Sequence, residues 1–159
     1  MHAVQLCGST HALRIIRHKT LMGSLKEVAK RKGFVVTQEP HLRHEERVLK
    51  PDLILRRRHR IAIVDTAVPW DTPERYAASR LHKRAKYSAL IAQQRKGDPG
   101  YAITVDAFIV GARGRWDPKN DKLLKLLGIK LSEGQKEAMC TLMVKLTGRI
   151  TDHFLTSAC

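Results

Sequence analysis

The stretch from Lys50 to Tyr87 constrains the fold of this 159-residue chain more than any other. Two apolar runs, Leu53 to Leu55 and Ile61 to Val64, have the length and composition of strands and are separated by a basic segment, which predicts a β-hairpin. One aspartate lies at the edge of each run. A tight turn between the runs places Asp52 opposite Asp65, with their Cβ atoms about 5 Å apart.

Two carboxylates at that separation repel each other unless a cation or a shared proton compensates. Hard carboxylate oxygens are the ligands that Mg²⁺ takes from a protein, so Asp52 and Asp65 are the predicted metal ligands. The backbone carbonyl of Thr66 is a candidate for completing the coordination shell. Mn²⁺ is expected to substitute for Mg²⁺.

A helix is predicted directly after the hairpin. The segment Thr72 to Glu74 supplies an N-cap, a first-turn proline and a first-turn acid. Tyr76, Arg80, Lys83 and Tyr87 recur at helical spacing and share one face, which aims a lysine at the sheet. Two carboxylates and a lysine in this frame are what a metal-dependent phosphodiesterase needs, because the lysine neutralises charge that develops on the phosphate.

Each part of this pattern also has a structural explanation. Pro51 and Asp52 can form a turn, Asp65 can accept hydrogen bonds at the end of the sheet, and Lys83 can be a solvated helix residue. For any one residue alone the structural explanation is preferred. The order and spacing of all of them together favour a site.

The order Pro51-Asp52, Asp65, and Lys83 to Tyr87 (KRAKY) resembles the restriction-like endonuclease domain at the C-terminus of site-specific non-LTR retrotransposons of the R-two clade. That family is a branch of the PD-(D/E)xK nuclease superfamily. Gly111 to Trp116 (GARGRW) and the closing helices also look like the family, so the resemblance covers nearly the whole chain.

The resemblance implies an α/β (α+β) fold with a restriction-endonuclease-like core, in which helices flank a small mixed β-sheet and a C-terminal helical extension follows. It implies that Asp52 and Asp65 hold the metal of an Mg²⁺-dependent endodeoxyribonuclease. By resemblance, the enzyme nicks target DNA in the nucleus, and the nick primes insertion of the element. The reverse transcriptase portion is then normally in the same polypeptide.

The position of the lysine departs from the superfamily pattern, which has it two residues after the second acid, where this chain has Ala67. The retrotransposon branch moves it to the following helix, where Lys83 is the candidate and Lys86 competes with it. Enzymes of the superfamily often carry a glutamate on the first helix near the metal, so Glu27 is a candidate accessory ligand. A solvated glutamate paired with a neighbouring base is the alternative.

Lysine and arginine number 30 against 15 acidic residues, and the formal net charge is +15. Such an excess indicates a polyanion binder. Double-stranded DNA is the predicted partner and element RNA a further candidate. An inactive DNA-binding relic and a basic RNA-binding structural protein remain as alternatives. The candidate DNA contacts are Arg56, Arg57, Arg58, Arg80, Arg84, Tyr87, Arg113 and Arg115.

His2 and Cys7 have the H-x₄-C spacing of the second half of a zinc knuckle. The C-x₂-C pair that forms the first half of a knuckle does not precede them. Two ligands do not make a structural zinc site. Because the family carries a CCHC knuckle upstream of the nuclease, we expect residues 1–8 to be a remnant of one and the chain to be the tail of a longer polyprotein. The nuclease core is then 9–131, with a C-terminal helix, 132–159, packed on it.

Other elements follow from apolar spacing and from helix caps. Asp106, within a predicted strand, is expected to be structural. The stripe of Ala138, Leu142, Val144, Leu146 and Ile150 on the last helix is expected to pack against the sheet.

No stretch approaches the roughly 20 apolar residues of a membrane span, and no signal-peptide pattern opens the chain. The remaining elements are a helix over 9–32, a strand over 34–37, a loop or short helix over 41–50, a central strand over 102–110, a helix over 117–127 and a helix from 132 to about 155.

Overall fold

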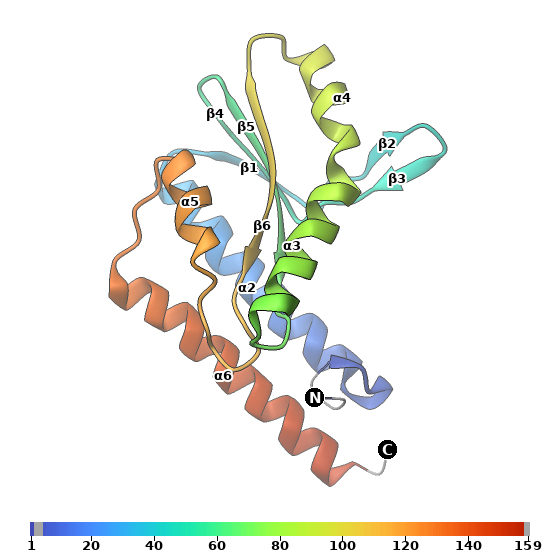
Figure 1. Cartoon of the computed structure of the whole chain (residues 1–159), viewed down its shortest axis with the longest axis vertical. Helices are drawn as coiled ribbons and strands as arrows, with labels where there is room; N and C mark the ends of the chain where they lie inside the picture. The colour runs from blue at the N-terminus through green and yellow to red at the C-terminus, as the bar shows by residue number, and fades with distance from the viewer. Residues whose placement is uncertain (2–4, 158–159) are drawn as a thin grey trace.

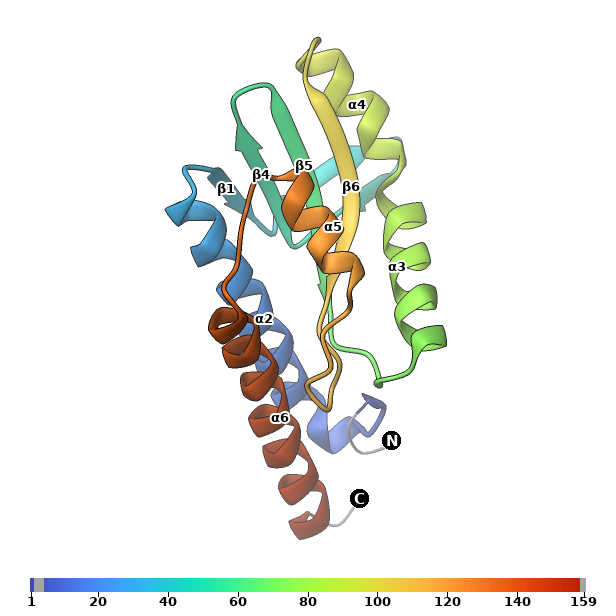
Figure 2. The same ribbon diagram turned by 60° about the vertical axis from the view of Figure 1, so that its left-hand side comes forward.

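The computed structural model describes Met1 and residues 5–157, and it has helices on both faces of a four-stranded mixed sheet (Figures 1 and 2). The strand order is β1-β4-β5-β6, with β5 and β6 parallel and the other pairs antiparallel. The predicted mixed α/β class is therefore confirmed. In chain order the elements are η1 (Gly8–Thr10), α2 (His11–Arg31), β1 (Val35–Gln38), β2 (Leu42–His44), β3 (Arg47–Leu49), β4 (Leu53–Arg57), β5 (Arg60–Ala67), α3 (Pro73–Tyr87), α4 (Ala89–Gly97), β6 (Ala102–Ile109), α5 (Lys119–Leu126) and α6 (Glu133–Thr156).

The predicted hairpin is confirmed as β4 and β5. Leu53 pairs with Val64, and the two-residue turn consists of Arg58 and His59. Because this register continues outward by one residue, it sets Asp52 opposite Asp65 at the open end of the hairpin. The predicted helix after it is also confirmed, since the hydroxyl oxygen of Thr72 accepts a hydrogen bond from the backbone N–H of Arg75.

Side chains of the central strands alternate between two buried layers. Leu53 and Val64 face the layer made by α2, α5 and α6, whereas Ile54 and Ile63 face the layer that contains Tyr87 of α3. Each fully buried leucine or isoleucine contributes roughly 1.5–3 kcal/mol. Both faces of the hairpin are covered, so its register is strongly specified, because a slip by one residue would exchange every side chain between the layers.

Two strand predictions were wrong. Residues 41–50 form the antiparallel hairpin of β2 and β3, not a loop or short helix. The predicted central strand is β6, which lies at the edge of the sheet. Its sequence resembles a central strand because helices cover both of its faces, and because Asn120 of α5 binds both the N–H and the carbonyl of Ile109, which protects the exposed edge.

The last helix has the predicted capping box of Ser132 and Gln135, but its buried stripe was predicted wrongly. Of the predicted stripe, Ile150 is buried, whereas Leu142 and Val144 are exposed. The buried residues of α6 are Met139, Met143, Thr147 and Ile150, and the helix packs mainly on α2. Within the part of the chain that the structure describes, no helix is both long and apolar enough to cross a bilayer.

Candidate active site

The open end of the β4–β5 hairpin holds two nearly buried carboxylates. Asp52 is 8% exposed and Asp65 is 2% exposed. The backbone N–H of Asp52 donates to Oδ1 of Asp65 at 2.9 Å, which fixes the second carboxylate against the backbone that carries the first. The hairpin thus brings the two predicted metal ligands together.

Asp52 is held by donors from two elements. The backbone N–H and the hydroxyl of Thr66 both donate to Oδ2 of Asp52, at 2.6 and 2.5 Å. Nε2 of His18, on α2, lies 3.1 Å from Oδ1. Thr66 was predicted only for its carbonyl, and His18 was missed. The signal for His18 was its spacing, since it precedes the buried residues Leu21 and Leu25 by three and seven positions and so lies on the same helical stripe.

Lys83 of α3 completes this group. Its Nζ lies 2.5 Å from Oδ2 of Asp65, and its side chain is 23% exposed. Lys86 is exposed, and its Nζ lies 4.9 Å from the centroid of the Tyr87 ring. Of the two candidate lysines, the helix therefore brings Lys83 to the carboxylates.

The pKa values of the two carboxyl groups are shifted in opposite directions. Burial raises the pKa of Asp65, and the neighbouring charge of Asp52 adds to this, although Lys83 opposes both. Burial also acts to raise the pKa of Asp52, but the hydrogen bonds and charge of His18 and the hydrogen bonds of Thr66 outweigh it, so that pKa is lowered. The repulsion between two adjacent negative charges therefore disfavours the ionised form of Asp65 rather than that of Asp52.

The unfavourable ionisation of Asp65 predicts how Asp65→Asn changes thermal stability. The raised pKa means that the folded state binds the Asp65 proton more tightly than the unfolded chain, so ionisation of Asp65 lowers stability as the pH rises through that pKa. In EDTA at pH 7 we expect Asp65→Asn to melt at a higher temperature than the natural chain. The advantage should shrink as the pH falls towards the raised pKa, which thermal melts at successively lower pH would measure.

Asp152→Asn is the matched control, because it removes the same charge from an exposed position on α6. It should show no advantage that depends on pH in this way. The same melts with Mn²⁺ test metal binding, since a cation at 100 times its Kd stabilises the folded state by about 2.7 kcal/mol. Mn²⁺ should raise the melting temperature of the natural chain and of Asp152→Asn but not of Asp65→Asn. Equal effects in all three would contradict a site at Asp65.

Glu27 does not join the carboxylates. It is exposed and lines a groove between α2 and α6, together with Gln135 and Leu142. It lies nine residues beyond His18, the α2 residue that reaches Asp52, which is about 13 Å along the helix. The prediction of Glu27 as an accessory ligand was therefore wrong.

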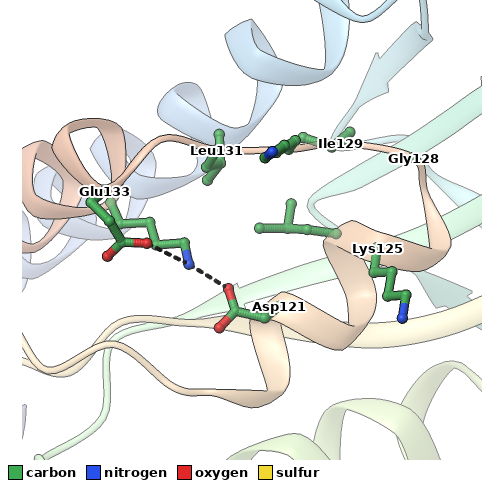
Figure 3. A pocket seen from close by; sticks show the side chains of 9 residues that line it. Asp121, Lys125, Gly128, Ile129, Leu131 and Glu133 are labelled. Atoms are coloured by element: carbon green, nitrogen blue, oxygen red, sulfur yellow. Dashed lines mark ion pairs between the residues drawn. The ribbon is translucent and has the colours of Figure 1, made fainter.

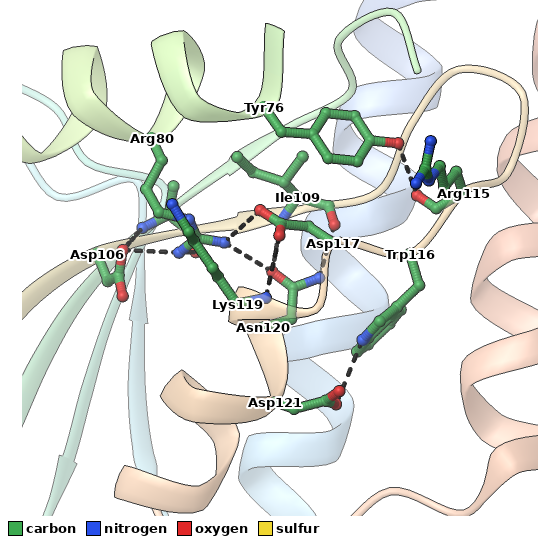
Figure 4. Close-up of polar contacts among 11 residues, drawn as sticks. Tyr76, Arg80, Asp106, Ile109, Arg115, Trp116, Asp117, Lys119, Asn120 and Asp121 are labelled. Carbon is green, nitrogen blue, oxygen red and sulfur yellow. Dashed lines mark hydrogen bonds and ion pairs between the residues drawn. The ribbon is translucent and has the colours of Figure 1, made fainter. Parts of the chain in front are cut away.

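Arg80 was predicted as a DNA contact, but it is buried at 4% exposure in a polar network (Figure 4). Its guanidinium contacts Asp106 at 2.7 Å and Asp117 at 2.8 Å, and it donates to the carbonyl of Ala107 and the side chain of Asn120. This correction also gives Asp106 a partner, which agrees with its predicted structural role. The sequence could not show it because the partners lie 26 to 40 positions away along the chain.

Three more predicted DNA contacts have partners within the protein. Tyr87 is 1% exposed, and its hydroxyl donates to the carbonyl of Lys50. Arg57 donates to the carbonyls of Lys32 and Leu127, at the ends of α2 and α5. The guanidinium of Arg56 is paired with Asp98 at 2.7 Å. The predicted contacts with exposed side chains are Arg58, Arg84, Arg113 and Arg115.

No protein-family model matches the chain. A "Retrovirus-related Pol polyprotein from type-1 retrotransposable element R2" of Popillia japonica is 31% identical over 135 residues, which are 83% of this chain and 28% of that polyprotein. The chain is homologous to R2 retrotransposon Pol polyproteins. An R2 polyprotein of Nasonia vitripennis is 27% identical over 137 residues, which are 80% of this chain and 13% of the relative. The chain thus spans less than a third of the length of these R2 polyproteins.

The GARGRW loop, Gly111 to Trp116, is anchored by Asp71, which was not predicted as a site residue. Asp71 is buried and accepts hydrogen bonds from the backbone N–H groups of Arg113 and Arg115, at 2.8 and 2.9 Å. The hydroxyl of Tyr76 donates to the carbonyl of Arg115. A Cβ at Gly111 would clash with both anchors, so this glycine allows the close backbone approach. The loop therefore presents the side chains of Arg113 and Arg115 on a fixed backbone.

Cys7 is buried near the start of the chain, with its Sγ 3.1 Å from the hydroxyl of Ser9. His2, the other predicted knuckle ligand, lies outside the described residues. Among the residues that the structure describes, no cluster of three or more His, Cys, Asp or Glu side chains could hold a metal ion. A metal at Asp52 and Asp65 would therefore depend on two side-chain ligands, the number that Mg²⁺ commonly takes.

Proposed function

We propose that this R2 homologue is a restriction-like, PD-(D/E)xK-type endodeoxyribonuclease that uses Mg²⁺ to nick target DNA and so prime insertion of a retrotransposon. One observation carries the proposal: Asp52 and Asp65 lie side by side, with Nζ of Lys83 2.5 Å from Oδ2 of Asp65. This group combines two potential metal ligands with a cation that can face a phosphate. The homology to R2 Pol polyproteins supports the assignment.

The residues present fit a divalent cation. Both ligands are hard carboxylate groups. Oδ2 of Asp52 already accepts two hydrogen bonds, whereas Oδ1 of Asp52 and both oxygens of Asp65 have one partner each and keep a second lone pair for a cation. The raised pKa of Asp65, caused by burial and by Asp52, indicates negative charge that a cation would compensate. Bound there, Mg²⁺ or Mn²⁺ would supply Lewis-acid activation of water and of the phosphate.

The protein groups then have separate tasks. Thr66 and His18 hold Asp52 in one orientation, and the backbone N–H of Asp52 holds Asp65. The ammonium of Lys83 stabilises the charge that grows on the phosphate oxygens during in-line attack by water. Because these groups lie on β5, on two helices and directly before β4, they are preorganised before substrate binds.

The partners follow from charge and homology. A net charge of +15 favours double-stranded DNA as the substrate, and exposed Arg84, Arg113 and Arg115 are available for phosphate contacts. Element RNA is a further candidate. The relatives are Pol polyproteins, so we propose that a reverse transcriptase portion normally shares the polypeptide and that the protein acts in the nucleus.

Conversion of supercoiled plasmid to nicked circles tests the proposal. With Mg²⁺ or Mn²⁺ the natural chain should nick, and Asp65→Asn should bind the plasmid without nicking, because it removes one metal ligand. Asp152→Asn, which loses the same charge at an exposed position, should nick normally. Binding without nicking by all three would overturn the nuclease assignment in favour of a DNA-binding relic.

A further inference from the structure

A second basic feature lies at the opposite end of the β4–β5 hairpin from the carboxylates. The two-residue turn and the end of α5 enclose a groove of about 360 Å³. Its basic lining comes from Arg57, Arg58 and Arg60 at the hairpin turn and from Lys125 on α5. Asp65 and Arg60 are five residues apart on β5, so the groove lies about 17 Å or more from the proposed catalytic group.

The cations of this groove are not neutralised. Among the residues that the structure describes, no acidic side chain pairs with Arg58, Arg60 or Lys125. Other basic residues nearby are engaged, since Arg56 pairs with Asp98 and Arg57 binds two helix-end carbonyls. Like charges gathered without a counter-ion attract a polyanion.

The backbone at the turn supplies an independent observation. Arg58 has φ of 52°, in the left-handed region where glycine or asparagine is favoured at such turns. A non-glycine residue in that conformation strains the backbone and lowers stability. The strained position therefore carries an exposed arginine that lines the groove, where a glycine would be the unstrained choice.

A second hollow, of about 550 Å³ (Figure 3), has part of its lining in common with the groove. The two share Lys125 and Gly128, and the second adds Lys130. Its two acids, Asp121 and Glu133, share one partner, since both pair with Lys136, at 3.0 and 3.3 Å, which offsets one of their two charges. Neither acid pairs with Lys125 or Lys130. A continuous track of unpaired cations therefore runs from the β4–β5 turn along the end of α5.

We propose that this track binds the phosphate backbone of a nucleic acid at a site separate from the Asp52–Asp65 pair. The unpaired cations supply the affinity and the strained Arg58 sets one contact. The inference does not rest on cleavage, because the site binds without metal. The track is a second nucleic-acid-binding site, on the side of the sheet that carries α5.

Binding of a fluorescein-labelled 12-base-pair duplex and a 12-nucleotide single strand, measured by anisotropy in EDTA between 50 and 200 mM salt, tests the proposal. The variant is Arg58→Gly with Lys125→Gln. Each lost phosphate contact lowers the slope of log affinity against log salt by about 0.9 on duplex or about 0.7 on a single strand. We expect both contacts to be lost, and the probe with the larger loss identifies the form of nucleic acid that the track holds.

Lys145→Gln with Arg149→Gly is the matched control, which removes the same charges from exposed positions on α6. Its slope should stay closer to that of the natural chain. Equal losses in both double variants would overturn the proposal, because the effect would then be general charge. Arg58→Gly alone should raise the melting temperature while weakening binding, since glycine relieves the strain. Weaker binding can then be separated from unfolding.

Discussion

Replacing Lys83 with methionine is expected to lower the rate of nicking by about 10²–10³-fold while plasmid binding is retained. That range is the usual cost of removing one group that stabilises transition-state charge. Methionine keeps the length of the side chain on α3 and removes only the ammonium that lies 2.5 Å from Asp65. Single-turnover nicking with saturating protein measures the loss, because it separates the chemical step from DNA binding.

Lys86→Met is the control for this prediction. Lys86 is on the same helix, but its side chain is exposed and contacts the ring of Tyr87 rather than a carboxylate. Its loss should leave the single-turnover rate close to that of the natural chain. A large loss in Lys86→Met with none in Lys83→Met would reverse the assignment of the catalytic lysine.

A second readout does not depend on cleavage. Lys83 lowers the pKa of Asp65, against the larger effects of burial and of Asp52. Lys83→Met should therefore raise the pKa of Asp65 further, and a carboxyl titration followed by NMR in EDTA would measure the shift. An unchanged pKa would show that the ion pair does not persist in solution, even if nicking were lost.

The hairpin and the carboxylate pair could be predicted because they depend on local patterns. Two apolar runs with a short basic segment between them leave only one compact pairing, and the register then places Asp52 opposite Asp65. The same holds for the face of α3, where Lys83 follows from helical spacing after the Thr72 cap. In each case the decisive residues lie within about 20 positions of one another.

Other features could not be predicted because long-range packing decides them. Helical spacing places His18 on the buried stripe of α2, but only the packing of α2 against the hairpin selects Asp52, 34 positions away, as its partner. The stripe of α6 was predicted from its leucines, yet the methionines Met139 and Met143 are buried, since packing on α2 sets the rotation of the helix. Arg80 looks like any basic helix residue until the fold surrounds it with acids.

Arg80→Met is expected to lower the free energy of unfolding by about 3–5 kcal/mol, the cost of breaking a buried ion pair from one side. The change leaves Asp106 and Asp117 without their shared cation, and Asn120 loses one hydrogen bond (Figure 4). Urea unfolding measures the loss. Arg84→Met, at an exposed position one turn further along α3, should change stability by no more than about 0.5 kcal/mol.

A compensating variant tests the cause of that loss. Adding Asp106→Asn and Asp117→Asn to Arg80→Met removes the uncompensated charges, so part of the stability should return. Because Arg80 lies three residues before Lys83 and ties α3 to β6 and α5, any folded Arg80→Met should also position Lys83 less well and nick more slowly. Unchanged stability with weaker DNA binding would instead make Arg80 a DNA contact, and the network would not be what holds Lys83 against Asp65.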